Sequence, residues 1–80
     1  MENKIAVVAV IVEMEDAVEK VNALLHDFRQ YVIGRLGIPY REKGVSVISV
    51  VLDAPQEILS SLSGKLGMIK GVSSKVLTAK

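Results

Sequence analysis

The chain lacks cysteine and tryptophan, and it has a single phenylalanine among its 80 residues. Without cysteine, neither a disulfide nor a thiolate metal site can hold the fold together. A domain of this length buries only about 60% of the surface that its unfolded chain exposes, so its own core is thin. Association with further copies is the remaining source of stability that the composition predicts.

The chain also lacks an excess of charge of either sign. Ten basic and nine acidic residues give a formal net charge of +1. Nucleic-acid binders usually carry a strongly basic domain or stripe, so no direct nucleic-acid partner is expected. The apolar run at residues 5–12 is too short to span a bilayer, and an acidic EMED segment follows it instead of a signal-peptide cleavage site. We expect one cytoplasmic domain over residues 1–80, with no membrane association.

Two β-branched runs are typical of buried strands, IAVVAVIV at residues 5–12 and VSVISVVL at residues 45–52. Weaker strand patterns follow at residues 31–38, which contain two glycines, and at residues 71–78. Glycine inside a strand often marks a bulge or a close backbone approach. The sequence therefore predicts four strands.

Each β-branched run is followed by a helix-start signal. Asp16 precedes Glu19 at capping-box spacing, and Asp53 precedes Gln56 in the same way, with Pro55 in the first turn. Apolar residues at helical spacing follow both signals. The resulting order, β-α-β-β-α-β, predicts a ferredoxin-like α+β sandwich, a four-stranded antiparallel sheet with two helices on one face.

The central strands of this predicted sheet are apolar on both faces. An antiparallel sheet with one wet face should alternate apolar and polar residues, yet positions 5, 7, 9 and 11 are as apolar as positions 6, 8, 10 and 12. Two helices can cover one face only, and an exposed apolar area of several hundred Å² usually marks an interface. We expect a homo-oligomer packed through its sheet, a dimer or a tetramer by closed symmetry.

Residues that could carry chemistry are few. His26 is the sole histidine, so a single chain cannot build a transition-metal site, although a symmetric site made with carboxylates between subunits stays open as an alternative. A nucleophilic serine needs a base, and His26 is the only histidine that could serve the serines of this chain. We therefore expect no catalytic residues, no metal site, no cofactor and no enzymatic activity.

The segment RLGIPYREKG, residues 35–44, joins the two halves. Proline cannot donate to a ladder and favours an extended predecessor, so Ile38–Pro39 is predicted to end the second strand and residues 40–43 to form the turn. The turn can be an ordinary charged loop. Alternatively, it forms the rim of a subunit junction that binds a partner or an anionic effector through four candidate residues: Arg35, Tyr40, Arg41 and Lys43.

Two segments, YVIGRLGIPYREKGVSVISVVLDAP and LSGKLGMIKGVSSKVL, resemble the family of iron-only hydrogenase system regulators over nearly the whole chain. The pattern KLGMIKGVSSKV is shared more widely, with ACT-type regulatory domains and with the C-terminal domain of the nickel-responsive repressor. The resemblance implies a ferredoxin-like fold, assembly through sheets or strand edges, and small effectors bound at subunit junctions.

Departures from these relatives limit what the resemblance implies. The His and Cys ligands of the nickel-responsive repressor are missing, and the first strand starts by Ile5, which leaves no room for that repressor's DNA-binding arm. The first strand–helix connection has no glycine, unlike many amino-acid-binding ACT domains. The leading hypothesis is a regulatory homo-oligomer that senses a small effector or engages a partner protein. The alternative is a ligand-free scaffold subunit that binds another protein.

Overall fold

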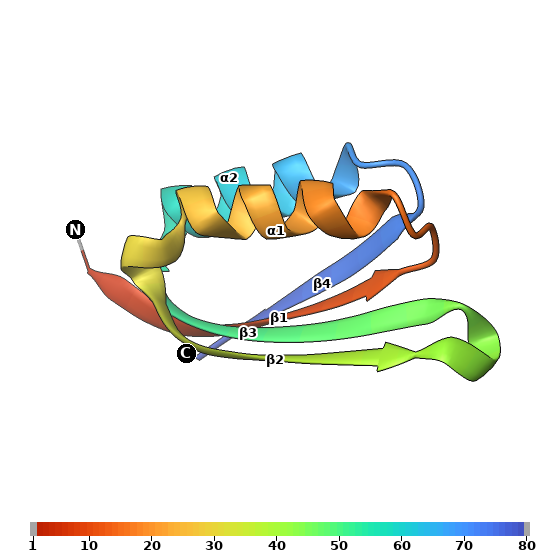
Figure 1. Ribbon diagram of the computed structural model, residues 1–80. Helices are drawn as coiled ribbons and strands as arrows, with labels where there is room; N and C mark the ends of the chain where they lie inside the picture. The colour runs from red at the N-terminus through yellow and green to blue at the C-terminus, as the bar shows by residue number, and fades with distance from the viewer. Residues whose placement is uncertain (1, 80) are drawn as a thin grey trace.

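The computed structural model describes residues 2–79, and its architecture is an α+β sandwich. The strands are β1 (Asn3–Val12), β2 (Val32–Tyr40), β3 (Val45–Pro55) and β4 (Val72–Thr78). The helices are α1 (Ala17–Asp27) and α2 (Gln56–Gly67), with short 3₁₀ turns η1 (Arg29–Tyr31) and η2 (Arg41–Lys43). The four strands form one antiparallel sheet in the order β2-β3-β1-β4, and both helices cover the same face (Figure 1). The predicted ferredoxin-like fold is confirmed.

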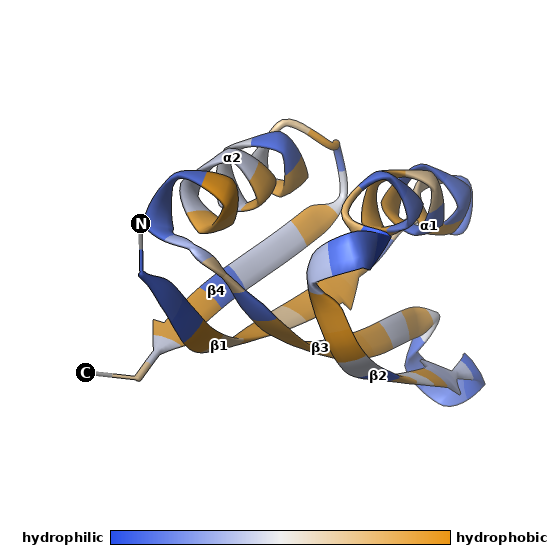
Figure 2. Cartoon of the chain, turned by 90° about the vertical axis from the view of Figure 1, so that its left-hand side faces the viewer, coloured by the Kyte–Doolittle hydropathy of each residue, from blue (hydrophilic) through white to orange (hydrophobic). Residues whose placement is uncertain are grey.

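The core lies between the helices and the sheet. Every second residue of the two central strands is buried there: Ala6, Val8, Val10, Val12, Ile48, Val50, Leu52 and Ala54. The helices contribute their apolar rows to the same cluster: Ala17, Val21 and Leu25 from α1, and Leu59, Leu62 and Leu66 from α2. Hydrophobic segments run along the strands, whereas hydrophilic segments gather on the outer sides of the helices and on the turn after β2 (Figure 2).

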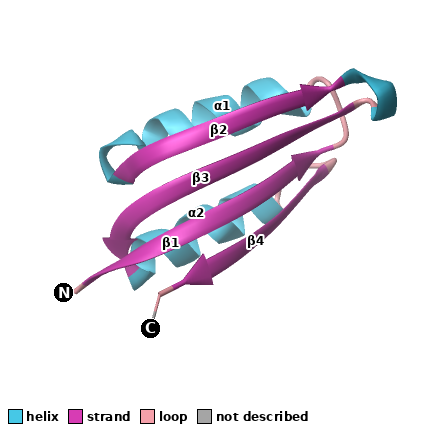
Figure 3. Cartoon of the chain, turned by 90° about the horizontal axis from the view of Figure 1, so that it is seen from below, coloured by secondary structure: helices cyan, strands magenta, loops and turns pink. Residues whose placement is uncertain are grey.

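The other face of the sheet, here called the outer face, is left uncovered by residues 2–79. Seen from below, the strands lie in front of both helices and no element lies over them (Figure 3). The alternate residues of β1 are accordingly exposed, with Ile5 at 46%, Val7 at 37% and Ile11 at 45%. The sheet is thus apolar on both faces, as the sequence predicts.

Strand β2 continues through Pro39 to Tyr40 and does not end at Ile38–Pro39, so that prediction was wrong. Because β2 is an edge strand bonded only to β3, a missing N–H on its free side breaks no ladder bond. The register shifts between Val32 and Gly34, which agrees with the first of the two alternatives for the strand glycines, a bulge. The second alternative, a close approach by another backbone, does not occur within residues 2–79, since nothing lies within 4 Å of a Cβ built on Gly34 or Gly37.

The two predicted capping boxes are absent. Asp16 precedes α1 but its side chain makes no cap hydrogen bond, and its backbone is already helical. Asp53 lies inside β3, paired with Ile5 of β1, so α2 starts three residues later at Gln56, after Pro55. The β1–β3 ladder extends to Asn3 and Pro55, and its hydrogen bonds outweigh the local helix-start signal at Asp53.

Candidate functional site

Three connections meet at one end of the sheet. Strands β1 and β2 both run antiparallel to β3 and are therefore parallel to each other, so the chain leaves both at the same end. Strand β4 runs antiparallel to β1 and begins at that end. The β1–α1 connection, the turn η2 and the α2–β4 connection thus lie near one another, although they are far apart in the sequence.

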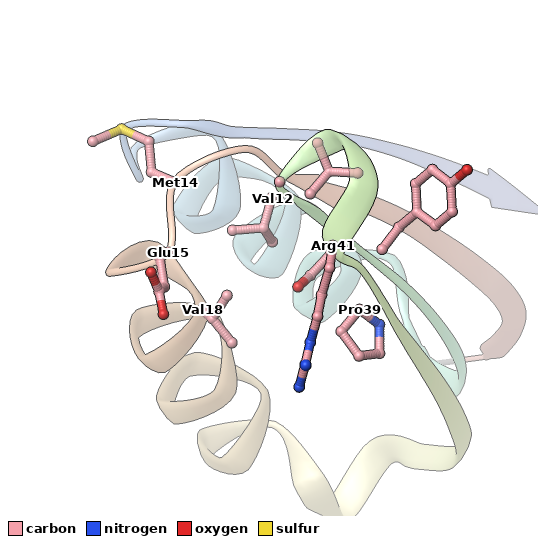
Figure 4. A pocket seen from close by; sticks show the side chains of 10 residues that line it. Val12, Met14, Glu15, Val18, Pro39 and Arg41 are labelled. Atoms are coloured by element: carbon pink, nitrogen blue, oxygen red, sulfur yellow. The ribbon is translucent and has the colours of Figure 1, made fainter.

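A hollow of about 420 Å³ lies between the first two of these connections. One wall comes from the end of β1 and the start of α1: Val12, Met14, Glu15 and Val18. The other comes from β2, η2 and the start of β3: Pro39, Tyr40, Arg41, Gly44, Val45 and Ser46. The Arg41 side chain extends into the space between Val18 and Pro39, and Glu15 lies on the α1 side (Figure 4).

The turn η2 leaves Arg41 free. Gly44 closes the turn with a φ of 65°, a left-handed conformation that suits glycine, and its N–H donates to the Arg41 carbonyl over 3.1 Å. The Tyr40 hydroxyl donates to Glu42 Oε2 over 3.0 Å, which engages the carboxylate next to Arg41 in sequence. Within residues 2–79, no side-chain hydrogen bond involves the Arg41 guanidinium.

The wall of the hollow formed by the end of β1 and the start of α1 is held in place by Gly71. The Glu13 N–H donates to the Gly71 carbonyl over 2.8 Å, which ties the β1–α1 connection to the start of β4. Gly71 has a φ of 84°, and a Cβ built on it would lie 2.5 Å from Cγ of Met14. The Met14 side chain therefore packs directly on the Gly71 backbone, at the only place where the described glycines are approached this closely.

The four residues predicted as a site are not all brought together. Arg41 and Tyr40 line the hollow, whereas Lys43 lies in η2 without lining it. Arg35 points to the helix side of β2, donates from Nη2 to Asn22 Oδ1 over 2.8 Å, and lines a separate hollow of about 230 Å³. The structure therefore divides the predicted set.

Sequence reasoning missed the α1 side of the hollow, above all Glu15 and Val18. The predicted topology already held a signal, because two parallel strands end at the same edge and the connections after them must be neighbours. Which side chains line the space depends on how α1 packs on the sheet. That packing is tertiary information that the sequence pattern does not contain.

No group of three or more His, Cys, Asp or Glu side chains that could hold a metal ion occurs within residues 2–79. His26 is exposed on α1, and its carbonyl accepts a bond of 2.9 Å from Arg29 Nη1. None of the helices described is long and apolar enough to cross a membrane.

The outer face is the second candidate site, and the strand register orders its residues into rows. One row holds Ile38, Val47, Ile11 and Ser73, the next Leu36, Ser49, Ala9 and Lys75, and the third Gly34, Val51, Val7 and Leu77. The exposed fraction reaches 61% at Leu36 and 74% at Leu77. Four strands about 4.8 Å apart and about 25 Å long give this face a projected area on the order of 500 Å².

Among the described strand residues, the charged ones on the outer face are Asp53 and Lys75, one of each sign. The other two charged strand residues, Lys4 and Arg35, alternate onto the helix side. A face of this size with so little charge is at the upper end of what monomeric proteins expose.

Comparison with known families gives one match, which covers most of the chain. The family model described as TM1266-like, "Iron-only hydrogenase system regulator, putative", matches residues 4–76. No curated protein sequence matches the chain significantly.

Among solved structures, the uncharacterized protein TM1266 from Thermotoga maritima is 36% identical, with a TM-score of 0.94 over 99% of this chain and 100% of that one. The C-terminal domain of the MgtC protein from Mycobacterium tuberculosis is 16% identical, with a TM-score of 0.72 over 98% of this chain and 89% of that one. A formyltetrahydrofolate deformylase from Pseudomonas putida is 18% identical, with a TM-score of 0.63 over 95% of this chain but only 29% of the enzyme. These last two similarities concern the fold alone.

Proposed function

The chain belongs to the TM1266-like family, whose description names a regulator of the iron-only hydrogenase system, and on this premise we propose that it is a non-enzymatic regulatory module of that system. In this proposal the module is a cytoplasmic homo-oligomer that assembles through the outer face of its sheet. It responds to a small effector or a partner protein at the end of the sheet where Arg41 lies.

The observation that carries this proposal is the uncovered apolar outer face. Val7, at the middle of the face, lies in register between Val51 and Leu77 and is 37% exposed, although all three side chains are apolar. Burying apolar surface gains about 25 cal/mol per Å², and a second copy offers the same kind of surface. A thin 80-residue core gains from such burial.

Regulation then follows from mass action. An effector changes the population of an assembly state only to the extent that it binds that state more tightly. Tyr40 and Val45 line the hollow at Arg41 and are also paired with each other at the end of the outer face. An effector in the hollow would therefore touch residues at the border of the assembly face.

The assembly is tested by placing a charge at the middle of the outer face. We expect the wild type to be a dimer or tetramer by size-exclusion chromatography with light scattering, and Val7→Lys to be a folded monomer by the same method and by circular dichroism. Ala23→Lys makes a matched apolar-to-lysine change on the exposed side of α1 and should leave the oligomer intact. A monomeric wild type, or an oligomeric Val7→Lys, contradicts the proposed assembly.

The regulatory role is tested in the host. Deletion of the coding sequence should change hydrogenase transcript level or hydrogenase activity, and Val7→Lys at the native locus should reproduce the deletion while Ala23→Lys behaves as wild type. Unchanged hydrogenase transcript and activity after deletion would refute the role in this system.

A further inference from the structure

We infer that the hollow between α1 and η2 binds a small monocarboxylate with a compact apolar body, held through the Arg41 guanidinium. This inference rests on the proposed regulatory function and names the chemical class of its effector. It is carried by three features of the hollow: a free guanidinium, a lining with a single basic residue, and apolar side chains on both walls.

The guanidinium of Arg41 is the free one of the three arginines. Arg29 donates to the His26 carbonyl over 2.9 Å, and Arg35 donates to Asn22 over 2.8 Å. Arg41 has no comparable partner within residues 2–79, and its side chain extends into the hollow (Figure 4). A guanidinium presents a planar fork of donors that matches a carboxylate with two parallel hydrogen bonds.

The charges around the hollow favour a ligand with one negative charge over a ligand with two. Within residues 2–79, Arg41 is the only basic residue that lines the hollow, and the acidic Glu15 lines the opposite wall. Because Arg41 and Glu15 carry equal and opposite charges, a phosphate monoester would add an excess of about −1.5 to −2 charges. A monocarboxylate adds an excess of one negative charge only, and its carboxylate would lie at Arg41, across the hollow from Glu15.

The remaining walls are suited to an apolar body. Val18 and Pro39 lie on either side of the Arg41 side chain, and Val12 and Val45 line the same hollow. Ligand sites are usually hollows of about 300–1,000 Å³ with mostly apolar lining and a few placed polar groups. A volume of about 420 Å³ lies at the lower end of that range, which suits a ligand of small size.

The test uses 3-methylbutanoate as the probe, on the full-length protein, by isothermal titration and by two-dimensional amide NMR. We expect a dissociation constant on the order of 1 mM or lower, with amide shifts concentrated at Val18 and Gly44. Two further probes define the recognised chemistry: 3-methylbutanamide keeps the apolar body without the charge, and inorganic phosphate supplies charge without the body. Both should bind at least about tenfold more weakly.

Matched variants locate the contact. Arg41→Gln should weaken 3-methylbutanoate binding at least about tenfold. Arg35→Gln makes the same change on the same hairpin outside the hollow and should leave the affinity within about twofold, as should Lys43→Gln in η2. Equal binding by Arg41→Gln, equal binding of the amide, tighter binding of phosphate, or no detectable binding of 3-methylbutanoate would each overturn the inference.

The binding test and the assembly test have outcomes that can be told apart. If the wild type is an oligomer but does not bind 3-methylbutanoate, the monocarboxylate site is refuted and the assembly stands. The ligand-free scaffold then becomes the better interpretation. A monomeric wild type that binds 3-methylbutanoate through Arg41 refutes the assembly and keeps the site.

Discussion

Gly71 is the residue that fixes the relative position of the β1–α1 and α2–β4 connections. Its positive φ of 84° and the Met14 side chain on its backbone leave no space for a larger residue. We expect Gly71→Ala to lower the free energy of unfolding by about 1–3 kcal/mol, because alanine is strained at this φ and its Cβ must displace Met14. Urea denaturation followed by circular dichroism measures the change.

Gly67→Ala is the matched control, since Gly67 ends α2, has no positive φ, and nothing lies within 4 Å of a Cβ built there. It should be neutral or stabilising by up to about 1 kcal/mol, the helix propensity difference between the two residues. An equal loss of stability in both variants would show that neither the φ of Gly71 nor its contact with Met14 matters.

The sequence identified candidate site residues by the chemistry of their side chains, but it could not identify their neighbours in the fold. Arg35 and Arg41 are the same residue type within one hairpin, and the sequence assigns them the same role. The structure separates them because Arg35 alternates onto the helix side of β2, where Asn22 accepts its hydrogen bond, whereas Arg41 lies beyond the strand in η2. An arginine's availability for a ligand therefore depended on a tertiary partner that no spacing rule identifies.

At the scale of elements, the number and type of helices and strands followed from the sequence, and several boundaries did not. Hydrophobic periodicity reports which residues are buried, and it located both helices and all four strands. Boundaries depend on strand pairing: β2 runs past Pro39 because its free edge tolerates proline, and Asp53 stays in β3 because β1 pairs with it. Local signals at both places were outweighed by partners distant in the sequence.

The buried row of α2 is expected to contribute a large share of the stability. Leu62 is fully buried, in the core cluster between α2 and the sheet. Leu62→Ala should lower the free energy of unfolding by about 2–5 kcal/mol, because it removes apolar contacts and leaves a cavity. Since small domains are stable by only about 5–15 kcal/mol in total, the thermal midpoint measured by calorimetry should fall markedly.

Ser60→Ala on the exposed side of the same helix is the control. It removes only a hydroxyl that accepts a 3.1 Å bond from Gln56, and surface changes of this kind are usually within about 0.5 kcal/mol. If Leu62→Ala lowered the free energy of unfolding as little as Ser60→Ala does, α2 would not pack as the structure shows.

At the scale of the whole molecule, the two charges of the outer face can pair between copies. Asp53 is in register with Ile5, and Lys75 with Ala9, while β1 lies between β3 and β4. Val7 is therefore midway between the two charges, both along the strands and across them. A twofold axis that lies in the plane of the interface, passes near Val7 and is perpendicular to the line from Asp53 to Lys75 brings Asp53 of each copy over Lys75 of the other. Neither charge is then buried without a partner.

This arrangement predicts that reversing one of the two charges changes which copies associate with each other. Asp53→Lys and Lys75→Asp should each weaken self-association at least about tenfold, because each homodimer then has two like-charge contacts. A mixture of the two variants should associate as a heterodimer, since both contacts regain opposite charges, and the double variant should self-associate again. Analytical ultracentrifugation of each protein and of the mixture measures this.

Glu57→Lys and Lys70→Asp, which make equal charge changes away from the outer face, should associate as wild type. If the two variants lose self-association and the mixture does not restore it, the copies pack in a different orientation; if neither variant loses it, the outer face is not the interface.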